Sequence, residues 1–293
     1  MKRPLFRCCS SLPYALIAIT LSFAHVLKAQ DEPSTPAAAK LIVIPPDING
    51  LKTIIAGPEA MRPIRVALYE GPGSGDGGVI NVEASAHQIE GATVTRLTPA
   101  EIGTVNLSNR FDVVVFSGGS GSAQAKAIGE AGRANIRDFV KNGGGYVGIC
   151  AGAYLACAGY DWGLGILDAC TVSSKWRRGK AFLDIELTPA GRDLFGPVEG
   201  PFKVRYANGP VIKPFNRDDI PDYATVSIFR TETAMNDTPK GIQVGSPAQA
   251  IGTFGKGRVF ISSPHPENTP GLEYMIPRVL LWSAAADNHA TTL

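Results

Sequence analysis

The sequence has few of the residues that mark metal and nucleic-acid sites. Its 293 residues include 5 cysteines and 4 histidines, and their spacing matches neither a zinc site nor a haem attachment motif. It also contains no phosphate-binding P-loop motif. The formal net charge is only +2, and the basic excess lies within the first 29 positions, so we expect no nucleic-acid-binding surface. We therefore expect no metal, no cofactor and no nucleic-acid partner.

The chain also lacks a long hydrophobic run of the kind that spans a membrane. Residues 1–29 begin with the basic MKRPLFR, continue with the apolar LPYALIAITLSFA and end in small residues, an order typical of a secretory signal peptide. A short signal anchor is the alternative. We expect a secreted or periplasmic protein with no stable membrane anchor after signal removal.

Composition divides the rest of the chain into three parts. Residues 30–60 contain QDEPSTPAAAK, which is typical of a flexible linker and a lead-in. Residues 61–287 carry regular apolar patterns and are predicted to form one domain. Residues 288–293 form a short polar tail.

Apolar segments predict a largely parallel sheet. Residues 122–142 have the apolar spacing of a helix, and they lie between two continuous apolar segments. Such strands, separated by helices, are typical of a parallel sheet covered on both faces. The predicted strands of this part are IRVALY (64–69), ATVTRL (92–97), FDVVVFSGG (111–119) and GYVGIC (145–150).

Later segments predict a partly antiparallel extension and a last helix near residues 270–286. We expect an α/β fold, a three-layer flavodoxin-like sandwich with a mainly parallel central sheet. In such sheets ligands bind beyond the carboxyl ends of the strands. The later strands are FLDIEL (182–187), ATVSIF (224–229), AQAIGTF (248–254) and GRVFIS (257–262).

Cys150 lies at one of these strand ends, between Gly148 and Gly152. This spacing is that of a nucleophile elbow, a strained strand-to-helix turn whose neighbours must be small. The following helix N-terminus favours a thiolate, and Ala151 offers a backbone N–H group to an oxyanion. The alternative is a packing turn that holds an inert buried thiol.

A thiol nucleophile needs a base, and His265 is the best candidate. It follows a late strand and so is expected at the same sheet edge as Cys150. Glu267, two residues later, could hold the imidazole in one tautomer. His87 is expected on a helix surface and His289 in the polar tail.

Together, GYVGICAGAYLA and SPHPE resemble the class I glutamine amidotransferase-like superfamily. With YEGPG and FSGG, the pattern most resembles the amidotransferase-like domain at the N-terminus of some biotin–protein ligases. The resemblance implies a triad of Cys150 as nucleophile, His265 as base and Glu267 as its orienting carboxylate. It also implies an oxyanion hole formed by Gly118, Gly119 and Ala151.

The sequence departs from the glutamine-using members of that superfamily. Ala153 and Tyr154 stand where those members carry His-Gln, which argues against glutamine as the substrate. We also recognise no synthetase or ligase catalytic domain beside this segment. The resemblance then implies an exported Cys-dependent hydrolase of an amide, peptide or γ-glutamyl C–N bond, acting on a small molecule or peptide. A non-catalytic ligand-binding protein of the same fold is the alternative; the oligomeric state stays open.

Further residues were assigned from weaker patterns. Tyr154 and the basic SKWRRGK segment, through Arg177 or Arg178, are predicted to bind substrate, although such a basic run also suits a solvated hairpin. GSGDGG (73–78) matches a dinucleotide fingerprint, but its acidic residue disfavours phosphate, and a flexible loop is the simpler interpretation. Tyr206 and Asn208 belong to a strand entering a turn, which could face the site.

Cys157 and Cys170 allow two interpretations. Export favours a disulfide between them, which would leave Cys150 as the free thiol. Two buried reduced thiols fit equally well, because free cysteine is often buried.

Overall fold

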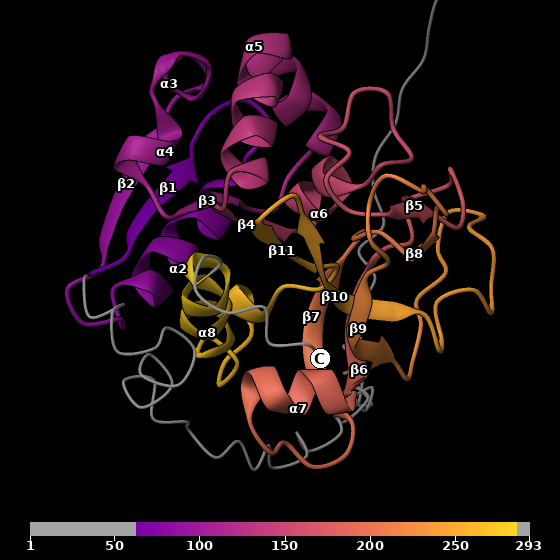
Figure 1. Ribbon diagram of the computed structural model, residues 1–293. Helices are drawn as coiled ribbons and strands as arrows, with labels where there is room; N and C mark the ends of the chain where they lie inside the picture. Colours follow the sequence, from indigo (N-terminus) through magenta and orange to yellow (C-terminus); the bar gives the residue numbers. More distant parts are fainter. Residues whose placement is uncertain (1–62, 286–293) are drawn as a thin grey trace, which may run out of the picture. The chain divides into compact units, whose positions relative to one another are not determined.

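A nine-stranded mixed sheet forms the centre of the computed structural model, which describes residues 63–285 (Figure 1). The strand order is β2-β1-β3-β4-β11-β10-β9-β6-β7. The predicted signal peptide, the whole linker and the polar tail lie outside the described residues.

The first five strands in this order are parallel. Their order, with β11 as the fifth, is that of flavodoxin-like folds. Strands β3 and β4 are buried at every position, which explains their uninterrupted apolar sequences. The five strands are β1 (Arg65–Tyr69), β2 (Thr93–Leu97), β3 (Val113–Phe116), β4 (Gly145–Ile149) and β11 (Gly257–Ser262).

The remaining four strands pair antiparallel and extend the sheet. In β6 and β7 buried positions mostly alternate with more exposed ones, the pattern of strands with one wetter face. A separate two-stranded sheet joins β5 (Ala169–Thr171) to β8 (Ile212–Pro214). The four strands are β10 (Pro247–Phe254), β9 (Ala224–Phe229), β6 (Lys180–Leu187) and β7 (Phe202–Ala207).

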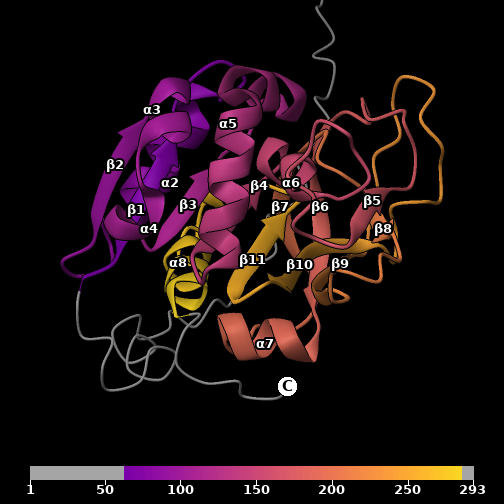
Figure 2. The same ribbon diagram turned by 45° about the horizontal axis from the view of Figure 1, so that its top comes forward.

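Helices cover the sheet in two layers, best seen in Figures 1 and 2. One layer contains α3, α4, α5 and α6, and the other contains α2, α7 and α8. Each of the two helix layers packs against its own cluster of buried apolar side chains. The helices are α2 (Asp76–Ala86), α3 (Pro99–Thr104), α4 (Leu107–Arg110), α5 (Gly121–Lys141), α6 (Ala151–Ala156), α7 (Pro189–Phe195), α8 (Met275–Ala284) and the 3-10 turn η1 (Pro266–Asn268).

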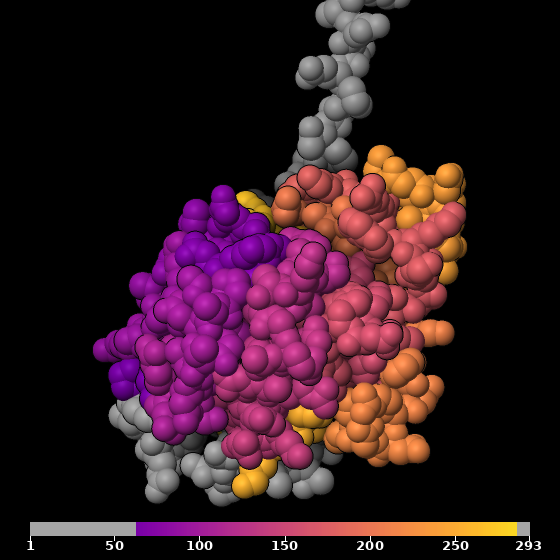
Figure 3. All heavy atoms as spheres, turned by 90° about the horizontal axis from the view of Figure 1, so that it is seen from above, coloured from indigo at the N-terminus to yellow at the C-terminus, as the bar shows by residue number. Residues whose placement is uncertain are grey.

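This architecture confirms the predicted α/β fold with a mainly parallel sheet and an antiparallel extension. One element differs in detail: the long helix α5 is interrupted at Gly129, where φ is 64° and ψ is −170°. Only glycine adopts such angles readily. The break was not predicted, because the apolar spacing of a helix is present on both sides of it. The surface in Figure 3 passes from the early part of the chain on the left, through its magenta middle, to the orange later part on the right. Among residues 63–285, no helix is long and apolar enough to cross a membrane.

Candidate active site

Cys150 lies at the sharp turn between β4 and α6, as the elbow pattern predicts. Its φ of 50° and ψ of −93° fall outside the regions that non-glycine residues prefer. Its amide donates to Ser262 O of the neighbouring strand β11 at 2.8 Å, which fixes the turn to the sheet. The residue is 5% exposed. The strain is therefore held by the sheet at the carboxyl end of β4.

Both flanking glycines are sterically required. A Cβ atom on Gly148 would lie 2.5 Å from Gly152 O, and one on Gly152 would lie 2.1 Å from Phe116 O of β3. Neither contact is possible for a real side chain, because backbone atoms cannot move aside cheaply. The small-residue pattern around Cys150 thus follows from close backbone packing of α6 on the sheet.

His265 and Glu267 form a buried hydrogen-bonded pair at the end of β11. His265 Nδ1 and Glu267 Oε1 are 2.7 Å apart. Burial lowers the pKa of His265, but its interactions with Cys150 and Glu267 outweigh burial and raise the pKa to about 10. The Glu267 carboxylate therefore favours the protonated form of the imidazole.

The thiol and the imidazole are neighbours without a well-formed hydrogen bond. Cys150 Sγ donates to Ala207 O, at the end of β7, over 3.4 Å. His265 Nε2 is buried and makes no hydrogen bond to another described residue. Catalytic hydrogen bonds are often loose in unliganded sites, so this geometry suits an unliganded nucleophile and base.

Gly118 and Gly119, the two glycines expected to form an oxyanion hole, lie beside Cys150 and His265. A Cβ on Gly118 would lie 2.7 Å from His265 Cε1, so the imidazole packs directly on this peptide. Gly119 has a φ of 141°, and a Cβ there would lie 2.0 Å from Gly73 O. Ala151 is the first residue of α6, where backbone N–H groups lack intrahelical acceptors.

The segment that matches a dinucleotide fingerprint is fastened beside these glycines. Ser120 N donates to Gly73 O and Gly75 N donates to Gly118 O, each over 2.8 Å. The segment therefore supports the loop that holds Gly118 and Gly119.

A cavity of about 340 Å³ opens in front of Cys150. Its walls come from the loop before α5 and the start of α5, from α6 and the segment after it, from the segment before β6 and from the end of β7. Gly119 lines it, whereas Gly118 and Ala151 do not. The lining residues are Gly119, Ser120, Gly121, Ser122, Cys150, Tyr154, Tyr160, Trp162, Ser174, Trp176, Ala207 and Asn208.

The predicted substrate-binding residues have different positions. Tyr154 lines the cavity, and its hydroxyl donates to Asn208 O over 3.1 Å; burial raises its pKa strongly. Arg177 lines an adjoining cavity of about 520 Å³, which shares Trp176 and Asn208 with the first. Its guanidinium lies over the Trp176 ring, 5.0 Å from the centroid. Tyr154 and Arg177 are therefore placed where a substrate could touch them.

Arg178 lines neither of these cavities. It is 2% exposed, and its guanidinium donates to Pro239 O at 2.8 Å and to Glu232 Oε2 at 3.3 Å. A third interaction joins it to Gln243 at 3.4 Å. Because these partners use its donors, Arg178 anchors the loop after β9, and the substrate-binding prediction for it is not supported by this geometry.

The other two cysteines described are free. Cys157 is fully buried, and its thiol donates to Ala153 O over 3.2 Å. Burial raises its pKa to about 12. Cys170 is half-buried, and burial also raises its pKa. Both thiols are therefore reduced in this structure. Cys157 is buried, as the second interpretation expects, whereas Cys170 is only partly covered.

Sequence reasoning missed most of the aromatic lining of the cavity. The rings of Tyr160 and Trp162 stack with centroids 4.5 Å apart, and Trp176 also lines the cavity. They lie in irregular segments without periodicity, so only their aromatic character could have marked them. Asn208, considered above as a residue that could face the site, does line it; it has a φ of 58° and accepts a hydrogen bond from Gly179 N at 2.7 Å.

The family comparison agrees with the first half of this site. Residues 64–176 match the family described as the N-terminal domain of biotin–protein ligase. This segment therefore resembles that domain, which has the class I glutamine amidotransferase-like fold, and the expected resemblance is confirmed. The match includes Cys150, Gly118 and Gly119 and ends before His265 and Glu267.

More distant similarities extend over more of the chain. An uncharacterised protein of Chlamydia muridarum is 28% identical over 183 residues, which are 54% of this chain and 61% of that protein. This chain thus spans less than two thirds of that relative. A cytoplasmic protein from Salmonella typhimurium is 14% identical, with a TM-score of 0.47 over 74% of this chain and 97% of that one. A ThuA-like protein from Parabacteroides merdae has the same identity and TM-score over 76% and 90%.

Proposed function

We propose that this protein is an exported Cys-dependent hydrolase of C–N bonds in amides, peptides or γ-glutamyl compounds. The observation that carries the proposal is the combination of a strained Cys150 with the buried His265–Glu267 pair beside it. A buried carboxylate that holds a protonated imidazole against a thiol is the arrangement that thiol hydrolases need. Nucleophile and base come from neighbouring parallel strands, β4 and β11, which end at one edge of the sheet.

In the first half of the reaction Cys150, as a thiolate whose proton has passed to His265 Nε2, attacks the carbonyl carbon of the substrate. The carbonyl π electrons move to oxygen, which the N–H groups of Gly119 and Ala151 would stabilise. The C–N bond then breaks, and the His265 imidazolium donates its Nε2 proton to the leaving nitrogen. A His265 pKa of about 10 keeps this proton available at neutral pH.

In the second half water cleaves the thioester that the first half leaves. The now neutral His265 takes a proton from the water as its oxygen attacks the acyl carbon, and the C–S bond breaks. This proton transfer forms the imidazolium again, and Glu267 stabilises it through the hydrogen bond to Nδ1. The products are a carboxylic acid, an amine and the starting pair.

The cavity suits a substrate with apolar or aromatic character next to the scissile bond. Tyr160, Trp162 and Trp176 are the large apolar or aromatic side chains that line it beside Tyr154. The adjoining cavity offers Arg177 and Lys180 and no acidic lining residue. An acidic group of the substrate would be favoured there.

A ligand-binding protein without catalysis is the second candidate. It is favoured by one observation, the hydrogen bond of the thiol to Ala207 O in place of His265 Nε2. The cavity and its aromatic walls would serve such a protein equally well.

Alkylation of the three cysteines separates the two candidates. Iodoacetamide rates at Cys150, Cys157 and Cys170 would be measured by mass spectrometry against pH, in the wild type and in His265→Ala. We expect Cys150 to react fastest, although Cys170 is more exposed, and to slow in His265→Ala. If Cys150 reacts no faster than Cys170 and the two proteins give the same curve, the hydrolase proposal fails. If Cys150 instead behaves as expected, an amide and γ-glutamyl peptide library would identify the substrate.

A further inference from the structure

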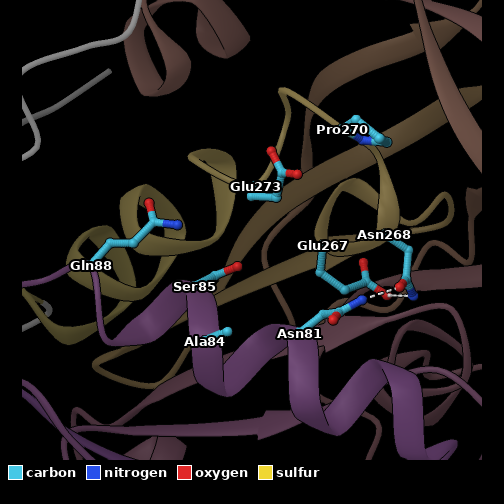
Figure 4. A pocket seen from close by; sticks show the side chains of 8 residues that line it. All are labelled: Asn81, Ala84, Ser85, Gln88, Glu267, Asn268, Pro270 and Glu273. Carbon is cyan, nitrogen blue, oxygen red and sulfur yellow. Dashed lines mark hydrogen bonds between the residues drawn. The ribbon is translucent and has the colours of Figure 1, made fainter.

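A second cavity, of about 300 Å³, lies behind Glu267 and away from Cys150 (Figure 4). It is bounded on one side by α2 and on the other by η1 and the segment after it. It shares no lining residue with the cavity in front of Cys150. The lining residues are Asn81, Ala84, Ser85, Gln88, Glu267, Asn268, Pro270 and Glu273.

This cavity is acidic. Of the described residues that line it, Glu267 and Glu273 are the charged ones, and none is basic. Glu273 Oε2 accepts from Gly271 N over 2.7 Å, so its other oxygen has capacity left. The cavity therefore has an excess of acceptors and favours a positively charged donor.

One buried acceptor in this cavity lacks a partner. Glu267 Oε1 is engaged by His265 Nδ1 and, at 3.1 Å, by Asn268 Nδ2, whereas Oε2 is buried without a hydrogen bond to any described residue. Ser85 is 2% exposed and also lines the cavity. Figure 4 shows the Ser85 hydroxyl and a Glu267 carboxylate oxygen facing each other across the cavity. A buried polar atom without a partner costs free energy that a donor between them would recover.

Neighbouring amides hold this arrangement rigid. Asn81 on α2 donates to Asn268 Oδ1, and Asn268 in turn donates to Glu267. This chain of hydrogen bonds, drawn in Figure 4, ties α2 to η1 and fixes the Glu267 carboxylate. The unpartnered Oε2 is therefore held in one place.

We propose that this cavity binds a small primary ammonium group, held between Glu267 Oε2 and Ser85 Oγ, with Glu273 supplying a second negative charge. An ammonium group has three N–H donors and no acceptor, which complements a site built of acceptors. Its charge strengthens each hydrogen bond it donates. Among the described residues no three His, Cys, Asp or Glu side chains cluster as metal ligands.

Occupation of this site would reach the reactive pair through Glu267. The same carboxylate would then bond His265 on one side and the ammonium group on the other. The binding itself needs neither Cys150 nor turnover, so it stands apart from the proposed hydrolase activity.

Calorimetric titration with methylammonium chloride tests the proposal in the full chain. We expect saturable binding that matched sodium chloride does not produce. Tetramethylammonium has the same charge and no N–H donor, so it should neither bind nor compete. The Cys150→Ala protein should bind methylammonium as the wild type does, which keeps this result separate from the hydrolase proposal.

Variants of the cavity sharpen the test. Ser85→Ala should bind methylammonium about tenfold more weakly, the effect of one hydrogen bond to a charged group. Glu273→Gln should also weaken binding, while Glu90→Gln, an exposed carboxylate outside the cavity, serves as the matched charge control and should not. The absence of saturable binding, equal binding by tetramethylammonium, or unchanged affinity in both cavity variants would overturn the proposal.

Discussion

The two halves of the sheet differ in burial and in what they give to the site. The parallel strands β3 and β4 are buried throughout, whereas β6 and β7 of the antiparallel half show alternating exposure. Helices on both faces cover the parallel half, so it can hold the strained backbone at Cys150. Rigid support of the nucleophile thus comes from the parallel half.

The antiparallel half reaches the site only through the end of one strand. In the strand order β7 is the edge farthest from the parallel half, yet Ala207 O accepts from the Cys150 thiol. Arg205 O accepts from His265 N over 2.8 Å, and Arg205 N donates to Thr269 Oγ1. The extension therefore returns to the parallel half and closes the site from the other side.

The largest expected effect is on the parallel half, in Gly152→Ala. The new Cβ would lie 2.1 Å from Phe116 O, and neither backbone can move without disturbing the elbow. We expect the free energy of unfolding to fall by about 3 kcal/mol, measured by urea denaturation, because overpacking a close backbone contact costs this much. Gly77→Ala is the control: nothing lies within 4 Å of a Cβ there, so stability should hold or rise slightly.

A smaller effect is expected where the two halves meet, in Gly209→Ala. Its Cβ would lie 2.0 Å from Ser263 O, between the end of β7 and the segment after β11. We expect a loss of about 2 kcal/mol, since this loop has more freedom to shift than the elbow. Ala207, whose carbonyl accepts from the Cys150 thiol, lies two residues before Gly209 at the end of β7, so the iodoacetamide rate at Cys150 should change. An unchanged rate together with unchanged stability would show that the antiparallel half does not close the site.

The smallest effect concerns the charge on the imidazole. In the wild type His265 should titrate near pH 10, which proton NMR of its ring can follow. Glu267→Gln removes an anionic partner while burial continues to oppose the charge, so the pKa should fall by about one unit or more, equal to about 1.4 kcal/mol. Glu273→Gln, which does not touch the ring, should leave it unchanged. A His265 pKa that is the same in Glu267→Gln would contradict the role given to this carboxylate.

The comparison of the two halves also explains which predictions could be made from the sequence. Continuous apolar runs marked the parallel strands because both of their faces are buried. The elbow could be predicted because its requirement is local: Gly148 and Gly152 must be small wherever a strand turns sharply into a packed helix. Even β9 and β11 were predicted with their observed bounds, since the burial of each strand depends mainly on its own residues.

The sequence by itself therefore determined the sheet, the strained cysteine and the short-range link between His265 and Glu267, which are two residues apart. Only the tertiary structure decided which of two adjacent arginines is available: Arg178 is buried against Glu232, while Arg177 lies over Trp176 beside the cavity. It also decided that β7, remote in strand order, supplies the acceptor for the Cys150 thiol. The reason is physical, because backbone sterics and apolar burial act over a few residues, whereas the partners of a charged or polar group are chosen by which distant segments pack against it.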